Sequence, residues 1–146
     1  MNAPAPRPPE ESTSLSLDFD KLAAVAACGG CLPVVVQNAD TRDVVLLAYT
    51  NERAMREAFR TRRLVLWSTS RDALWEKGAT SGARFELVEA RVNCEQNSLL
   101  YLVRPVAAPG SAPLGICHTA NRAGAPRNCF YRRIVPDTLA LENLDP

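Results

Sequence analysis

Three cysteines in the second half of the chain have the side-chain type that binds metal ions. Catalytic zinc is commonly held by three protein ligands, which leave a fourth position for a water molecule. The spacing of these cysteines contains no Cys-x-x-Cys pair, and small side chains of this kind can equally be buried in a core. Spacing therefore leaves two interpretations open, a zinc site or core packing, for Cys94, Cys117 and Cys129.

His118 directly follows Cys117 and is the only histidine of the chain. A lone histidine is most often structural. Beside a metal ligand, however, an imidazole can accept or deliver a proton in a reaction of zinc-bound water. Both interpretations stand, and the second makes His118 the candidate catalytic residue.

Cys28 and Cys31 form a Cys-x-x-Cys pair around two glycines. This spacing suits a metal site or a redox pair. A zinc knuckle normally needs a second pair, however, and a redox motif needs a thioredoxin-like βαβ context, which this sequence does not predict. We therefore predict a turn between a helix and a strand at Cys28–Cys31, with no function assigned to it.

The segment 67–84 brings hydroxyl, guanidinium, ammonium and indole groups together in the sequence. Such donors can surround a phosphate, and a tryptophan offers a flat surface to a base. The alternative is an ordinary polar loop that is anchored by two tryptophans. The candidate substrate-binding residues are Trp67, Ser68, Ser70, Arg71, Trp75 and Lys77.

The elements that must position these residues follow from hydrophobic periodicity. Apolar residues recur at helical spacing over 17–27 and 52–61, and Asn51 can cap the second helix. Pro- and Gly-rich composition predicts loops over 107–114 and 121–128. The predicted fold class is α+β, with a small, predominantly antiparallel sheet and a few helices. Apolar runs predict strands, the first two forming a hairpin, over 32–37, 44–49, 64–68, 85–92 and 98–105.

The chain has 146 residues, of which 47% are hydrophobic, and this is the size of a single domain. A Pro-rich start with little to bury predicts a disordered tail over 1–16 and one domain over 17–146. The formal net charge of +1 provides no global field for nucleic acids or membranes. Because the start also lacks a secretory signal, we expect a cytoplasmic protein whose cysteines are thiols or metal ligands rather than a disulfide framework.

Several motifs in order resemble those of phosphoribosyl-AMP cyclohydrolases. WSTSR, LWEKG and SG are followed by NCEQNSLL, CHT and NCFYR. The earlier run LPVVVQNADTRDVVLLAYTNERAM resembles the first hairpin and helix of that family. The resemblance extends over nearly the whole folded part, residues 32–133.

The resemblance implies an intertwined homodimer with zinc at the subunit interface, where Cys94 of one subunit joins Cys117 and Cys129 of the other. It also implies attack of a metal-activated water on C6 of the adenine ring of N1-(5-phosphoribosyl)-AMP, which opens the bond from N1 to C6. Zinc suits this reaction because it makes hydroxide available near neutral pH and stabilises the oxyanion that forms.

The sequence departs from the family's pattern around this site. Family members carry an Asp-Cys-Asp-x-Asp motif whose carboxylates bind magnesium, and the corresponding run here is NCEQN. Since magnesium binds through carboxylate and water oxygens, two neutral amides predict loss of the magnesium site. Ala83 replaces a frequent histidine, Thr69 replaces an arginine, and residues 124–126 lengthen the last loop. The magnesium positions predicted to be lost are Asn93, Glu95 and Asn97.

Three hypotheses follow for the function. The first is a zinc-dependent hydrolase whose heterocyclic substrate differs from phosphoribosyl-AMP and can carry phosphate. His118 would be its remaining proton carrier. The second is the ordinary phosphoribosyl-AMP cyclohydrolase of histidine biosynthesis. The third is a catalytically silent, zinc-stapled homodimer that serves in binding or structure. Nucleic-acid binding is not expected, because neither charge nor aromatic spacing supports it.

Overall fold

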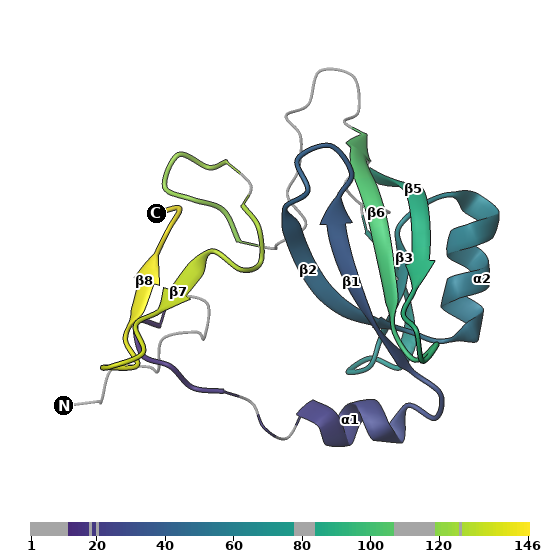
Figure 1. Cartoon of the computed structure of the whole chain (residues 1–146), viewed down its shortest axis with the longest axis horizontal. Helices are drawn as coiled ribbons and strands as arrows, with labels where there is room; N and C mark the ends of the chain where they lie inside the picture. Colours follow the sequence, from purple (N-terminus) through teal and green to yellow (C-terminus); the bar gives the residue numbers. More distant parts are fainter. Residues whose placement is uncertain (1–11, 18, 20, 78–83, 107–118, 126) are drawn as a thin grey trace.

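The computed structural model describes residues 12–17, 19, 21–77, 84–106, 119–125 and 127–146 (Figure 1). None of the described helices is long and apolar enough to cross a membrane. The elements in chain order are α1 (Lys21–Ala27), β1 (Leu32–Asn38), β2 (Val44–Thr50), α2 (Glu52–Thr61), β3 (Val65–Ser68), β4 (Ala73–Glu76), β5 (Arg84–Val92), β6 (Leu99–Val106), β7 (Arg132–Ile134) and β8 (Leu141–Asn143).

Four strands form the main sheet in the order β2-β1-β6-β5. In the β1–β2 hairpin, the Asn38 side chain accepts hydrogen bonds from the backbone N–H groups of Asp40 (2.9 Å) and Thr41 (3.0 Å). β1 runs parallel to β6, whereas the β1–β2, β5–β6, β3–β4 and β7–β8 pairs are antiparallel. The predicted fold class, α+β with small, mostly antiparallel sheets and few helices, is confirmed.

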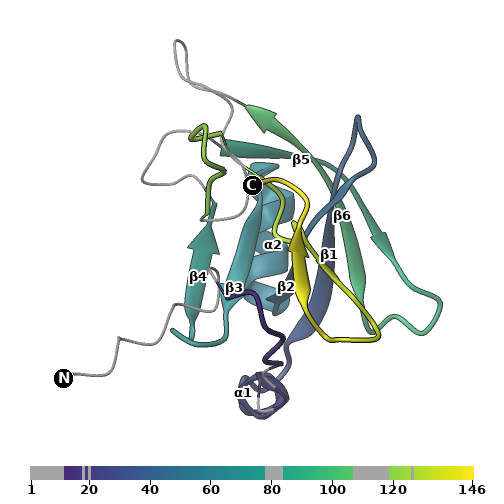
Figure 2. The same ribbon diagram turned by 90° about the vertical axis from the view of Figure 1, so that its left-hand side faces the viewer.

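One face of the main sheet carries the hydrophobic core. Side chains alternate between the two faces of a strand, so every second residue of β1 and β6 points to the same side. α2 and β3 lie against this side (Figures 1 and 2). The most deeply buried side chains that the sheet contributes to the core are Val34, Val36, Tyr101 and Val103.

α2 begins and ends at residues that satisfy its free backbone groups. Asn51 is the N-cap, and its side-chain oxygen accepts a hydrogen bond from the N–H of Ala54 at 2.9 Å. Arg62 ends the helix in the left-handed conformation, with a φ of 57°, and its N–H donates to the carbonyl of Ala58 at 2.8 Å. Ala54 and Ala58 are buried in the core, so the predicted amphipathic helix over 52–61 is confirmed.

The opposite face of the main sheet is open to solvent over much of its area. Val44 and Leu47 on β2 are 46% and 45% exposed. A cavity of about 490 Å³ crosses this face from β2 to β5, passing over Val35 and Leu100 on the central strands. We call the surface formed by Val35, Val44, Leu47 and Leu100 the open sheet face.

β3 and β4 form a hairpin that the sequence predicts only in part (Figure 2). The expected strand over 64–68 is confirmed, but no strand was predicted over 73–76. Leu74 and Trp75 of this short strand pack against the core. A strand of four residues between polar segments offers too few alternations for periodicity to reveal it.

The C-terminal hairpin, β7 and β8 with their connection, lies beside the main sheet (Figure 1). The start of the described chain runs along it. Ser14 pairs with Ala140, and the N–H of Leu141 donates to the carbonyl of Thr13 at 2.9 Å. These contacts involve residues that were predicted to belong to the disordered tail, whereas residues 1–11 lie outside the described residues, where the tail stays a prediction.

The helix predicted over 17–27 is described as helix from Lys21 to Ala27, and the predicted turn follows it. Gly29 and Gly30 have φ angles of 67° and 114°, which allow the chain to reverse between α1 and β1. This reversal brings Cys28 and Cys31 together as a disulfide, with their Cα atoms 5.8 Å apart. The expectation of thiols or metal ligands is therefore wrong for this pair, because two adjacent glycines fold the chain back on itself.

Candidate functional site

Cys94 lies in the turn that joins β5 to β6. The N–H of Asn93 donates to the carbonyl of Ser98 at 3.1 Å, and the Asn93 side-chain oxygen accepts hydrogen bonds from the N–H groups of Asn97 and Ser98, each at 2.9 Å. Gln96 completes the reversal in the left-handed region, with a φ of 57°. Cys94 is an exposed thiol that takes part in no disulfide. The turn thus presents this sulfur to solvent.

The three predicted magnesium positions come together in the same turn. Nδ2 of Asn93 donates to Oδ1 of Asn97 at 2.6 Å, and Nδ2 of Asn97 donates to Oε2 of Glu95 at 3.1 Å. The two amides therefore form a hydrogen-bonded chain that ends on the carboxylate. Within the described residues, no group of three or more His, Cys, Asp or Glu side chains is placed to hold a metal ion. Loss of magnesium binding stays a prediction.

Cys129 lies shortly before β7 and contacts β2, the edge strand of the main sheet opposite β5. Its N–H donates to the carbonyl of Val45 on β2 at 3.0 Å, and its exposed thiol is not part of a disulfide. The guanidinium group of Arg127 lies 3.7 Å from the centre of the Tyr131 ring. This stacking joins the chain on the two sides of Cys129, and the hydrogen bond to Val45 ties this segment to the sheet.

Within one chain, Cys94 and Cys129 lie at opposite edges of the main sheet. β5 leads to Cys94 and β2 is bonded to Cys129, and these are the two edge strands. Three interstrand spacings separate them, which is roughly 14 Å. The two cysteines also lie toward opposite ends of the strands. Val45, which binds Cys129, lies beside the end of β1, whereas Leu99, which follows the Cys94 turn, pairs with Val34 near the start of β1. One chain alone therefore does not bring these two ligands together.

The predictions for Cys117, His118 and Ala83 concern residues outside the described ranges, and they stay predictions. The donor chemistry of the two described cysteines fits zinc. Thiolates are soft ligands that zinc binds readily, and Cys94 and Cys129 are both exposed and outside disulfides. These two side chains are therefore accessible to a metal ion.

The tip of the β3–β4 hairpin gathers three of the predicted substrate residues. The hydroxyl oxygens of Ser68 and Ser70 are 3.3 Å apart, and Ser68 Oγ accepts hydrogen bonds from the N–H and the Nε of Arg71, each at 3.3 Å. Within the described part of the chain, no carboxylate forms an ion pair with Arg71. The exposed guanidinium group is thus available to an anion.

The two tryptophans of this hairpin point to opposite sides. Trp67 pairs with Leu74 and Trp75 pairs with Leu66, and neighbouring pairs of an antiparallel ladder face opposite ways. Nζ of Lys77 lies 6.0 Å from the centre of the Trp75 ring, so the predicted ammonium and indole meet there. Nε1 of Trp67 is buried and has no acceptor among the described residues. The two indoles therefore do not line the same side of one site.

Comparison with known proteins identifies the family. A sequence profile described as "Phosphoribosyl-AMP cyclohydrolase" matches residues 46–131, a range that contains every predicted metal and substrate residue. The chain belongs to the phosphoribosyl-AMP cyclohydrolase family. The resemblance expected from the motifs is thereby confirmed.

Individual members of the cyclohydrolase family match over most of the chain. A phosphoribosyl-AMP cyclohydrolase of Halobacterium salinarum is 38% identical over 136 residues, which cover 93% of this chain and 96% of that protein. One of Archaeoglobus fulgidus is 42% identical over 108 residues, 74% of this chain and 89% of that protein. The histidine biosynthesis bifunctional protein HisIE of Thermus thermophilus is 43% identical over 106 residues, which cover 73% of this chain and 44% of that protein.

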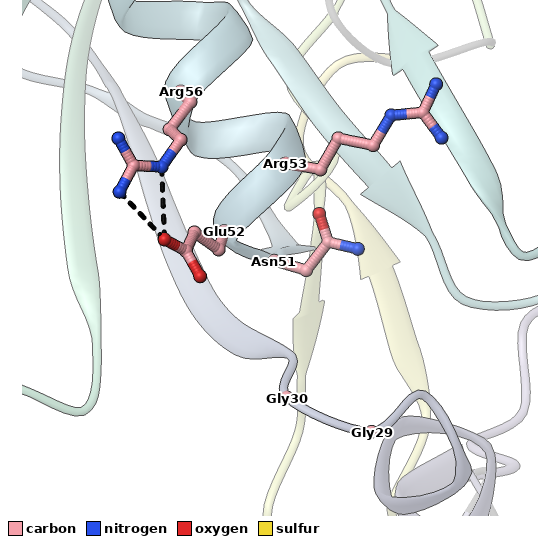
Figure 3. A pocket seen from close by; sticks show the side chains of 6 residues that line it. All are labelled: Gly29, Gly30, Asn51, Glu52, Arg53 and Arg56. Atoms are coloured by element: carbon pink, nitrogen blue, oxygen red, sulfur yellow. Dashed lines mark hydrogen bonds and ion pairs between the residues drawn. The ribbon is translucent and has the colours of Figure 1, made fainter.

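A cavity of about 600 Å³ at the start of α2 is separate from the cyclohydrolase motifs that carry the predicted site (Figure 3). Glu52 forms an ion pair with Arg56 at 2.8 Å, so these charges offset each other. Gly29 and Gly30 of the α1–β1 turn form another part of its wall. None of the predicted metal or substrate residues lines this cavity, and we do not assign it to the cyclohydrolase site.

Another cavity holds two arginines outside the motifs of the cyclohydrolase family, together with the arginine that ends the NCFYR motif. Three arginines between the last loop and β7 line it, together with the start and end of the described chain. These arginines lie in the run NRAGAPRNCFYRR, which was interpreted only as a loop and a cysteine motif. The segments that complete the cavity are far apart in sequence, so spacing could not reveal it. The arginines are Arg122, Arg127 and Arg132.

Proposed function

We propose that this chain catalyses the reaction for which its relatives are named, the hydrolytic opening of the adenine ring of N1-(5-phosphoribosyl)-AMP between N1 and C6. The observation that carries the proposal is the 38% identity to the Halobacterium salinarum cyclohydrolase over 93% of this chain. This ordinary reaction was the second of our three hypotheses. The first, an altered substrate, gains no support from the comparisons.

Zinc is the metal that we propose for the site. Cys94, Cys117 and Cys129 would hold it as thiolates, in keeping with their type and with their place inside the family match. When bound, zinc supplies a Lewis acid and a source of hydroxide near neutral pH. His118, next to one of these ligands in the sequence, would carry the proton that N1 needs when its bond to C6 breaks.

A homodimer would assemble the ligands that one chain keeps apart. Two sulfurs on one zinc ion each lie about 2.3 Å from the metal, whereas roughly 14 Å of sheet separates the edge strands that lead to Cys94 and Cys129. Taking Cys94 from one subunit and Cys129 from the other removes this conflict. The open sheet face supports the same proposal, because a second subunit would cover the exposed side chains of Val44 and Leu47.

The β3–β4 hairpin is the part of the chain that we propose contacts the substrate. Arg71 would bind an anionic group with the hydroxyls of Ser68 and Ser70 beside it, since its charge has no described ion-pair partner. Lys77 and Trp75 would offer an ammonium and a flat indole on one side of the hairpin. Trp67 faces the other side of the hairpin and its N–H is buried, so we do not assign it to this contact.

The Cys94 turn supports a second candidate function, the altered substrate. Its amides occupy two positions where the family pattern has carboxylates, and they hydrogen-bond to each other and to Glu95. If magnesium is essential for the parental substrate, this arrangement would favour another heterocycle. The identity to named cyclohydrolases extends on both sides of this turn, however, and the ordinary reaction is the proposal we carry forward.

The test is turnover of N1-(5-phosphoribosyl)-AMP by the purified, zinc-loaded protein, followed by the absorbance change on ring opening. We expect turnover that is lost in Cys94→Ser. Growth without histidine of a strain that lacks its own cyclohydrolase provides a second readout, which the unaltered chain should restore. Zinc-loaded protein that neither opens the ring nor restores growth would refute the proposal.

A further inference from the structure

The cavity beside the C-terminal hairpin concentrates positive charge. It has a volume of about 520 Å³ and lies between the loop after residue 119, the start of the described chain and β8. Three arginines line the cavity. Its described lining residues include no Asp or Glu. The lining residues on which the inference rests are Ser12, Asn121, Arg122, Arg127, Arg132 and Asn143.

Among the described residues, Arg127 is held in place without a carboxylate ion-pair partner. Its Nε donates to Oγ1 of Thr119 at 3.0 Å, its Nη1 donates to the backbone carbonyl of Asp145 at 2.9 Å, and its plane lies over Tyr131. The Asp145 carboxylate accepts a hydrogen bond from Asn121 at 3.0 Å. Neutral oxygens and a ring therefore orient the guanidinium group, and none of them cancels its charge.

Arg122 adds to this field. It is exposed, and within the described residues it forms no ion pair with a carboxylate. Arg132 forms part of the wall, and its Nη1 donates to the backbone carbonyl of Ser12 at 2.8 Å. The lining also includes Pro146, whose α-carboxylate would place one negative charge against the guanidinium groups. Like charges that face one cavity repel each other, and a bound anion would offset this repulsion.

Guanidinium groups match phosphate in shape as well as in charge. Each can donate two parallel hydrogen bonds to two phosphate oxygens, which gives both strength and orientation. The amides of Asn121 and Asn143 and the hydroxyl of Ser12 line the same cavity and can serve the remaining oxygens. The chemistry of the lining therefore selects a compact, doubly charged oxyanion over a neutral or cationic ligand.

The arginine cavity adjoins the proposed metal site. A neighbouring cavity of about 370 Å³ is lined by Cys129, and it shares Ser12, Arg132 and Leu141 with the arginine cavity. A molecule that reached from one cavity into the other would have one end among arginines and the other beside a proposed zinc ligand. Arg132, on the wall common to both, separates the two.

We propose that the arginine cavity binds a phosphate monoester, with Arg122 and Arg127 as its principal donors. On the proposed function, which this step assumes, the bound group is one of the two phosphates of N1-(5-phosphoribosyl)-AMP. The cavity would then hold a remote phosphate and orient the substrate, while the proposed metal site acts on the ring.

Calorimetric titration of the full-length, zinc-loaded protein with inorganic phosphate tests the site. We expect saturable binding of one phosphate per subunit, and a dissociation constant at least about tenfold higher in Arg122→Gln and in Arg127→Lys. Arg122 is exposed, so its variant should fold normally even if the Arg127 variant does not. Arg53→Gln, which removes an exposed arginine from the cavity at the start of α2, is the matched control and should bind phosphate as the unaltered protein does.

Binding of adenosine 5′-monophosphate and of adenosine distinguishes a phosphate ester from free phosphate. The ester should displace inorganic phosphate, and adenosine should not. No saturable phosphate binding, or an equal loss in Arg53→Gln and Arg122→Gln, would overturn the proposed site. Arginine-dependent phosphate binding in a protein that opens no ring would uphold the site and refute the proposed function. Ring opening with a KM unchanged in Arg122→Gln would uphold the function and refute the site.

Discussion

The Cys94 turn and the Cys129 segment place their cysteines by different means. In the turn, one neighbouring side chain, that of Asn93, closes the hydrogen bonds that hold Cys94. The Cys129 segment instead depends on distant partners, namely the carbonyl of Val45, which accepts from the N–H of Cys129, and the backbone carbonyl of Asp145, which accepts from Arg127. A local turn can form before any assembly, whereas a segment held from outside needs the rest of the fold. The sheet keeps the two cysteines apart within one chain, and in the proposed homodimer a second subunit would supply one of them.

The largest expected effect is the loss of zinc when either Cys94 or Cys129 is removed. Cys94→Ser and Cys129→Ser should each lose zinc, from about one ion per subunit in the unaltered protein to a small fraction of that, because a three-thiolate site loses a ligand. Metal analysis after dialysis against metal-free buffer measures this. Cys28→Ser, which alters the disulfide, is the control and should keep its zinc. Full zinc occupancy in either of the first two variants would remove that cysteine from the site.

Magnesium binding tests the amide positions of the Cys94 turn. The unaltered protein should bind no magnesium there, since Asn93 and Asn97 supply neutral amides that already bond to each other. The double variant Asn93→Asp with Asn97→Asp restores the carboxylates of the family pattern and should gain magnesium binding by calorimetry. Tight, stoichiometric binding to the unaltered protein would contradict the predicted loss of this site.

The local nature of the Cys94 turn predicts a moderate stability effect. Asn93→Ala removes the acceptor for two backbone N–H groups and should lower the free energy of unfolding by about 1–2 kcal/mol. Urea unfolding measures the change. Gln96→Ala, in the same turn, removes a side chain for which the structure shows no hydrogen bond and should change stability by less than about 0.5 kcal/mol. Equal losses in the two variants would show that the Asn93 hydrogen bonds do not hold the turn.

The smallest effect at neutral pH is expected at Tyr101, in the core of β6, the strand that follows the Cys94 turn. Burial raises the pKa of this phenol to about 12, and the Thr50 side chain opposes the shift only in part. The unfolded chain loses this proton near pH 10, before the folded chain does, so the free energy of unfolding should fall as pH rises from about 10 toward 12. Below pH 10 the contribution is constant.

Tyr101→Phe should weaken this alkaline decline and change stability little at neutral pH, because the buried hydroxyl has no hydrogen bond of ordinary geometry. Urea unfolding at pH 7 and at several values above pH 9 gives both quantities. An alkaline decline as steep in Tyr101→Phe as in the unaltered protein would assign it to other groups.

The elements that the sequence predicts well are those whose signals are local. Asn51 and the helix that it caps, the β1–β2 hairpin, and the strands β5 and β6 all follow from short-range periodicity or capping. β4 and β7 were not predicted, because their short segments ALWE and RRI offer less of an apolar run than VLWS of β3, and both strands owe their place to their hairpin partners. The turn at Cys28–Cys31 was predicted, but its cysteines were expected to be thiols or metal ligands, because composition does not show how closely two glycines fold the chain back.

The candidate site divides in the same way. The convergence of Asn93, Glu95 and Asn97 follows from their place in one turn, whereas the opposite positions of Cys94 and Cys129 depend on strand order. The arginine cavity needs segments from both ends of the chain, and no motif joins them. Its detection therefore requires the fold, because the residues that meet there share no spacing in the sequence.

Mixing two inactive variants tests the central claim most directly, namely that the chain opens N1-(5-phosphoribosyl)-AMP at a zinc site shared between subunits. Cys94→Ser and Cys129→Ser should each be inactive alone. After the two are mixed in equal amounts and allowed to exchange subunits, half of the dimers are mixed and carry one intact site of two. The mixture should recover about a quarter of the ring-opening rate of the unaltered protein. A mixture as inactive as its components, beside an active unaltered protein, would contradict the shared site, and an inactive unaltered protein would contradict the function itself.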